Sequence, residues 1–135
     1  MAVLLSMKKQ LKVSILVGLS LIGGLCSVSA HSFRVTVNSD GSKNTADDRL
    51  TLTEAVLFLN TEFADADDAP RLERALTPAE AAQVVEYTEE EERSIIQFAI
   101  PGDEVHFIKP PDGGFPGLHA NGVLVDGYTQ SGAKP

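Results

Sequence analysis

The chain has 135 residues, of which 43% are hydrophobic, and it carries a formal charge of −8 at pH 7. This length allows one domain or part of one. The acidic balance argues against nucleic acid and anionic membrane surfaces as partners, because phosphate binding requires clusters of Lys and Arg. The same balance favours solubility and is compatible with weak calcium binding.

Residues 1–30 have the organisation of a secretory signal peptide. Three lysines between residues 8 and 12 precede the apolar run Val13–Leu25, whose 13 residues suit a signal-peptide core and are short for a bilayer span. The small residue Ala30 places the cleavage immediately before His31. An uncleaved anchor helix is the alternative, and Met7 is an alternative start.

Cleavage after Ala30 changes the charge and the cysteine content of the chain. It removes three lysines and no acid, so the formal charge of −8 becomes −11. It also removes Cys26, the single cysteine, which leaves no disulfide and no cysteine metal site. We therefore expect a protein that is secreted or held at the cell surface.

The mature chain is predicted to begin with a strand. Phe33, Val35 and Val37 alternate with polar residues, which indicates one buried face over residues 31–38. Residues 38–42 are typical of a turn, because they cap their own backbone or accept a positive φ. Oxygen ligands for calcium are available here and in a later acidic loop, from Asp40, Asp47, Asp48, Asp65, Asp67 and Asp68. The spacing lacks the bidentate Glu of an EF-hand, so solvated loops are the alternative.

The stretch Asp47–Asn60 predicts a short helix. Thr51 is followed three residues later by Glu54, the pairing of a capping box. Asn60 tolerates a left-handed backbone and is predicted to end the helix. One face is apolar, carrying Leu52, Ala55, Val56 and Leu59. So short a helix is not stable alone in water, so this face is expected to pack against the flanking β segments.

The next segment is acidic and contains a second helix signal. Thr61–Arg74 lacks apolar periodicity and is predicted to be an exposed loop. Thr77 and Glu80 form another capping box, with Pro78 at the first helical position. A helix of about two turns, ending near Glu86, is expected from this pattern. The four acids Glu89–Glu92 are interpreted as a solvated linker.

Residues 94–135 have a different character. Three short strands are predicted, each stopped by Gly, Pro or Asp, at Ile95–Ile100, Val105–Ile108 and Val123–Val125. No helix is expected between them. This spacing favours a solenoid turn over a βαβ unit.

Three motifs resemble those of a known group. D-D-x-L-T-L-T-E-A-V-x-x-x-N, at Asp47–Asn60, resembles the N-terminal CSLREA-type domain of secreted bacterial right-handed parallel β-helix (pectin-lyase-like) proteins, although Thr53 stands where Arg is usual and Leu50 where Cys is frequent. I-I-x-F-x-I-P-G-D-x-V-H-F-I resembles the entry to their first coil. V-L-V-D-G-Y-T-Q-S-G-A-K-P resembles a recurrent segment of the same proteins, with Ser131 in place of Pro.

The resemblance implies a mainly β fold with two short helices. Residues 1–30 are the signal peptide, 31–93 the N-terminal cap region, and 94–135 the incomplete first coil of a right-handed parallel β-helix. One coil cannot bury its own face and about three are needed for stability, so the chain is expected to be a truncated piece of a longer protein. The sequence does not specify an oligomeric state.

The expected function is non-catalytic. By resemblance, the segment caps a secreted or cell-surface β-helix protein that is adhesive or associated with polysaccharide or cell-surface components. The alternative is the N-terminal fragment of a β-helix polysaccharide lyase or hydrolase whose catalytic coils lie elsewhere. No catalytic residue is predicted, because no spacing brings two carboxylates together and no Ser-His-Asp pattern occurs.

A copper site is a further alternative. After cleavage, His31 would offer a free amine and an imidazole, as in the copper brace of lytic polysaccharide monooxygenases. His106 or His119 would be the second ligand, with Tyr128 as an axial neighbour. An ordinary N-terminus before a strand accounts for His31 equally well.

Overall fold

The computed structural model describes residues 31–87 and 93–134. The predicted signal peptide, with Ala30, and the acidic run Glu89–Glu92 lie outside the described residues. None of the helices in the described part is long and apolar enough to cross a membrane.

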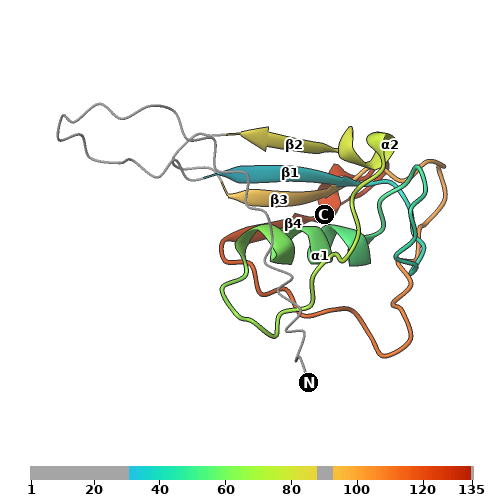
Figure 1. Ribbon diagram of the computed structural model, residues 1–135. Coiled ribbons are helices and arrows are strands. Elements are labelled where there is room, and N and C mark those ends of the chain that lie inside the picture. The colour runs from blue at the N-terminus through green and yellow to red at the C-terminus, as the bar shows by residue number, and fades with distance from the viewer. Residues whose placement is uncertain (1–30, 88–92, 135) are drawn as a thin grey trace, which may run out of the picture.

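One four-stranded sheet organises the described chain (Figure 1). Its spatial order is β2-β1-β3-β4; β1, β3 and β4 are parallel to one another, and β2 pairs antiparallel with β1. The strands are β1 (Ser32–Val37), β2 (Val84–Tyr87), β3 (Ser94–Phe98) and β4 (Val123–Asp126), and the helical elements are α1 (Leu52–Phe63), α2 (Pro78–Ala81) and the 3₁₀ turn η1 (Gly127–Thr129).

The predicted alternation in the first strand is confirmed. Val35 and Val37 are fully buried, whereas Arg34 between Phe33 and Val35 is exposed. Val35 is in register with Ile96 of β3, and Ile96 is in register with Val125 of β4. Because side chains alternate between the two faces of a sheet, these three residues form one row on the core face.

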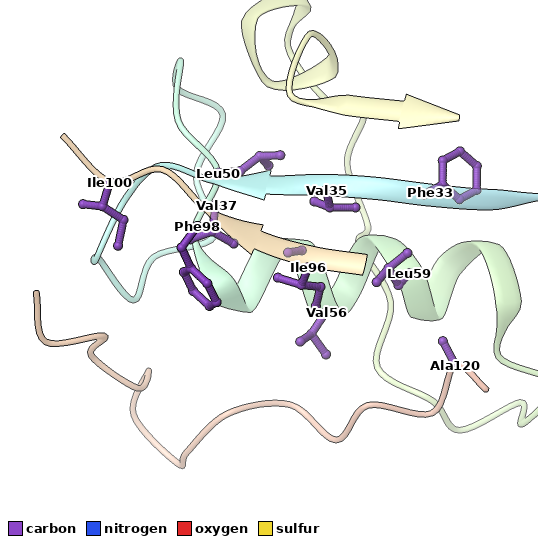
Figure 2. Packing of buried hydrophobic residues seen from close by; sticks show 11 residues of the cluster. Phe33, Val35, Val37, Leu50, Val56, Leu59, Ile96, Phe98, Ile100 and Ala120 are labelled. Atoms are coloured by element: carbon purple, nitrogen blue, oxygen red, sulfur yellow. The ribbon is translucent and has the colours of Figure 1, made fainter. Parts of the chain in front are cut away.

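Helix α1 covers this face, as its apolar pattern predicts. Ala55 and Leu59 are fully buried and Val56 nearly so, in one cluster with Val35 and Ile96 (Figure 2). The segment between β3 and β4 runs on the same side of the sheet as α1 (Figure 1). The helix therefore lies between the sheet and this long connection.

The two ends of α1 differ in how well they were predicted. Thr51 is the N-cap and Glu54 closes the capping box, as expected. The prediction that Asn60 ends the helix is wrong, because α1 continues to Phe63. Asn60 is fully buried inside the helix, where its side chain bonds distant backbone groups in place of its own helix end.

The second helix is shorter than predicted. Its capping box at Thr77 and Glu80 is present, but α2 spans only Pro78–Ala81. The helix was expected to continue to near Glu86, but Val84–Tyr87 is strand β2, with Val84 opposite Val35. The free edge of β1 explains the difference, since β-branched residues gain a ladder of backbone hydrogen bonds there that outweighs a weak helical preference.

The strand predicted at Val105–Ile108 is not formed. This segment has no assigned strand, and Val105 and Phe107 are 78% and 74% exposed. The neighbouring Lys109 donates its backbone N–H to the carbonyl of Asp40 at 3.1 Å. Alternating sequence alone does not make a strand when, among the described residues, no neighbouring strand lies beside it.

Candidate functional site

Two buried carboxylates and one arginine join the two capping boxes. Glu54 and Glu80 are 1% and 0% exposed, and each accepts a hydrogen bond from the backbone N–H of its own N-cap threonine. Arg74 lies between them, with Nη2 at 2.7 Å from Glu54 Oε1 and Nη1 at 2.7 Å from Glu80 Oε2. We call these three residues the carboxylate–arginine lock.

The lock is saturated with hydrogen bonds. Glu54 also accepts from the backbone N–H of Thr45, and Glu80 from that of Asp47. Arg74 donates its remaining N–H groups to Asn44 Oδ1 and to the carbonyls of Thr45 and Ala75. Since every carboxylate oxygen has partners, this cluster holds α1, α2 and the loop before α1 together, and it leaves no oxygen free for a ligand.

The electrostatics agree with this structural role. Burial raises the pKa of Glu80, but hydrogen bonds from Arg74 and from the backbone of Thr77 and Asp47 outweigh it, so the pKa lies below its ordinary value. The hydrogen bond to Glu80 is the largest effect on Arg74 and raises its pKa, against a smaller lowering by burial. Glu80 and Arg74 therefore stay charged near neutral pH.

Asn60 makes a second polar junction. Its Nδ2 donates to the carbonyls of Pro70 and Gly117 at 3.0 and 2.8 Å. Its Oδ1 accepts from the backbone N–H of His119 and Ala120. A fully satisfied amide inside α1 thus positions the connection between β3 and β4. The Glu and Asn of the D-D-x-L-T-L-T-E-A-V-x-x-x-N motif are scaffold residues in this structure.

The Asp126–Gln130 corner continues the pairing with β3 through side chains. Beyond β4, Thr129 Oγ1 accepts from the backbone N–H of Phe98 at 2.7 Å. The Gln130 amide accepts from Ile100 N–H at 2.8 Å and donates to the Ile100 carbonyl at 2.9 Å, as a neighbouring strand would. Asp126 caps the corner by accepting from the Tyr128 N–H. The spacing of D-G-Y-T-Q is therefore explained by this turn.

A pocket of about 340 Å³ lies beside this corner. Phe98 and Ile100 contribute apolar surface from the end of β3, and Ile108 adds to it. Asp103, Glu104 and His106 line it from the segment after β3, and residues 130–133 line it from the segment after η1. Sequence reasoning did not indicate this pocket, because its walls come from two separate segments of the chain, residues 98–108 and residues 127–133.

The calcium candidates are spread over the structure. Asp47 accepts hydrogen bonds from Thr45 Oγ1 and the Arg49 N–H, and Asp48 is exposed near Gln83. The exposed loop after α1 carries Asp65, Asp67 and Asp68, and Asp40 lies 4.0 Å from His106. Over residues 31–87 and 93–134, no three His, Cys, Asp or Glu side chains are grouped as a metal ion would require.

The candidate copper ligands are also placed. His31 precedes β1, and its Nδ1 contacts Glu86 of β2. His106 lies near Asp40, which follows the opposite end of β1, so about six strand residues at roughly 3.3 Å each separate the two imidazoles. His119 lies beside Asn60, and Tyr128 is 67% exposed in η1. A metal ion that binds His31 therefore cannot also bind His106 in this structure.

One buried hydroxyl of α1 has no hydrogen-bond partner among the described residues. Thr53 is 5% exposed, and its Oγ1 is unpaired. The arginine that pairs with Glu54 is Arg74, 20 residues further along the chain. Two capping-box glutamates with an arginine between them in the sequence are the signal that would have pointed to the lock.

Comparison with family models, curated proteins and solved structures gives no match to this chain.

Proposed function

We propose that residues 31–135 form the N-terminal cap and first coil of a right-handed parallel β-helix in a secreted or cell-surface protein, and that their role is structural. The observation that carries the proposal is the row Val35–Ile96–Val125 on the core face. The first two side chains are fully buried, whereas Val125 is 48% exposed at the open edge of the sheet. Because the last aliphatic residue of the row is only half buried, the row favours a further strand that would stack on β4 and cover Val125.

The order of the parallel strands supports the same proposal. β1, β3 and β4 lie side by side in chain order, and each makes its parallel pairing in register with the one before. Consecutive coils of a solenoid stack in this way, each contacting only its neighbours. Among the described residues, β4 has β3 on one side and no strand on the other.

Helix α1 fits the role of a cap. It contacts β1, the first of the parallel strands, and covers the core face on which the stacked row lies. Solenoids need atypical terminal units that cover the apolar interior. The lock and Asn60 add hydrogen bonds that hold this helix and the long connection in place.

The leader sequence and the motifs suggest what the whole protein does. A signal peptide at residues 1–30 would direct export, and the resemblance points to an adhesive or carbohydrate-associated protein whose partners are polysaccharides or cell-surface components.

The test is to determine what the gene encodes beyond the codon for Pro135 and to solve the structure of the complete exported protein. We expect further coils, a strand parallel to β4 beside Val123 and Val125, and a buried Val125 side chain. The proposal is overturned if Val125 remains half exposed at a free edge in the complete protein. Edman sequencing of the exported protein would separately test the predicted N-terminus at His31.

A further inference from the structure

Asn121 differs from the other asparagines of the chain in its surroundings. The asparagines are Asn38, Asn44, Asn60 and Asn121, and the structure describes all of them. Asn38 and Asn44 each accept a hydrogen bond at Oδ1, and Asn60 is fully buried. Asn121 is exposed, and no hydrogen bond joins its amide to the described part of the chain. Its side chain is therefore free to change conformation.

The residue that follows Asn121 is also distinct. After the other three asparagines, the next backbone N–H is held in a hydrogen bond or within helix α1, as for Ser39, Thr45 and Thr61. Gly122 lies in the turn before β4, and among the described residues its N–H has no acceptor. Its φ of +70° is one that glycine adopts without strain. The Gly122 nitrogen is therefore unhindered by a side chain and free of a competing hydrogen bond.

We propose that the Asn121–Gly122 peptide is a site of spontaneous deamidation and isomerisation in the folded protein. The Gly122 nitrogen attacks Cγ of Asn121, and the new C–N bond closes a succinimide ring. The side-chain nitrogen of Asn121 leaves as ammonia and takes the proton of the Gly122 N–H. Water then opens the ring at either carbonyl, which gives aspartate or isoaspartate at position 121.

The place of this turn in the fold gives the modification a structural effect. Asn121 lines a small pocket with His31 and Arg93, so the product places a carboxylate beside two basic side chains, where the amide was neutral. Isoaspartate also adds one methylene group to the backbone between the buried Ala120 and the start of β4. The modification therefore changes both the charge and the backbone length at the entry to β4. This inference does not rest on the solenoid proposal, because it depends only on the turn.

The experiment incubates the folded protein, and the same protein unfolded in guanidinium chloride, in a mildly alkaline buffer. Peptide mapping by mass spectrometry follows each asparagine through the mass gained when NH₂ is replaced by OH. We expect folding to slow the reaction of Asn121 by less than about tenfold, whereas Asn60, held inside a buried helix, should be slowed by more than about tenfold. If folding slows Asn121 by tenfold or more, the turn protects it and the proposal is wrong.

Two variants locate the reaction in the whole protein. Asn121→Gln keeps a neutral, exposed amide, but its longer side chain disfavours closure of the ring, so the acidic product seen by isoelectric focusing should be lost. Asn44→Gln changes the other exposed asparagine in the same way and should form that product as fast as the unmodified protein does. If Asn121→Gln forms it at the unmodified rate and its circular dichroism is unchanged, the reaction takes place elsewhere and the proposal is overturned.

Discussion

Individual buried polar side chains are expected to contribute strongly to the free energy of unfolding. Arg74 is the first example. Its guanidinium compensates two carboxylates that are almost completely buried. Arg74→Met keeps the length of the side chain but leaves both charges unpaired, so we expect a loss of about 3 kcal/mol in the free energy of unfolding, measured in urea at pH 7. Arg71→Met removes an arginine that bonds only the carbonyls of Ala64 and Ala66, and it should cost less than about 1 kcal/mol.

The same lock sets a dependence on pH. The pKa of Glu80 in the folded protein is below its ordinary value of 4.5, so its stabilising effect is fully present above that value and is lost as pH falls through the folded pKa. In Arg74→Met the burial of Glu80 is no longer offset by the guanidinium, so its pKa should rise. Stability should then increase as pH is lowered from 7 to 5, in contrast to the unmodified protein. Thermal melts across this range distinguish the two slopes.

Thr51 and Thr53 form a matched pair of buried hydroxyls. The Thr51 side chain caps α1, whereas Thr53 Oγ1 has no partner. Thr51→Val should lower the free energy of unfolding by about 1 kcal/mol, because the cap is lost. Thr53→Val keeps the shape and removes an unsatisfied group, so it should leave stability unchanged or raise it by up to about 1 kcal/mol. A large loss for Thr53→Val would mean that its hydroxyl has a partner.

At the scale of elements, α1 is stabilised by the face it buries rather than by its own length. Leu59 is fully buried in the core. Deleting a buried leucine side chain costs about 2–5 kcal/mol, so Leu59→Ala should destabilise the protein by an amount in that range. Glu62→Ala, exposed one helical turn further on, should stay within about 0.5 kcal/mol. Thr61 is unsuitable as a control, since its hydroxyl bonds Leu57 and Leu72.

At the scale of the whole molecule, the open edge of β4 is the feature that we expect to control self-association. Among the described residues, β4 pairs with β3 on one side only, and an edge strand with half-exposed Leu124 and Val125 is a template for association. Val125→Lys places a charge on the core face of this edge and should suppress concentration-dependent association in sedimentation velocity experiments. Ala66→Lys makes the same change of charge in the exposed loop and should suppress association less. Equal behaviour of the two variants would show that charge alone, and not the edge, controls association.

Local patterns in the sequence determined the elements whose signals lie within a few residues of one another. The first strand, both capping boxes, the apolar face of α1 and the strands at β3 and β4 follow from side-chain period and cap chemistry, which act over one or two turns of chain. The structure confirms these predictions. The motif Asp126–Gln130 was also visible in the sequence, although its role as a substitute for strand pairing was not.

Tertiary structure decided everything that depends on a distant partner. Val84–Tyr87 became a strand because β1 offered a free edge, and Val105–Ile108 did not because no described strand lies beside it. Asn60 was expected to end a helix and instead lies inside it, since the carbonyls of Pro70 and Gly117 satisfy its amide. The lock joins Glu54 to Arg74, which lies 20 residues further along the chain, and the pocket joins residues 98–108 to residues 127–133. Such groupings form when folding buries charged and polar groups beside one another. The local periodicity of the sequence therefore does not predict them.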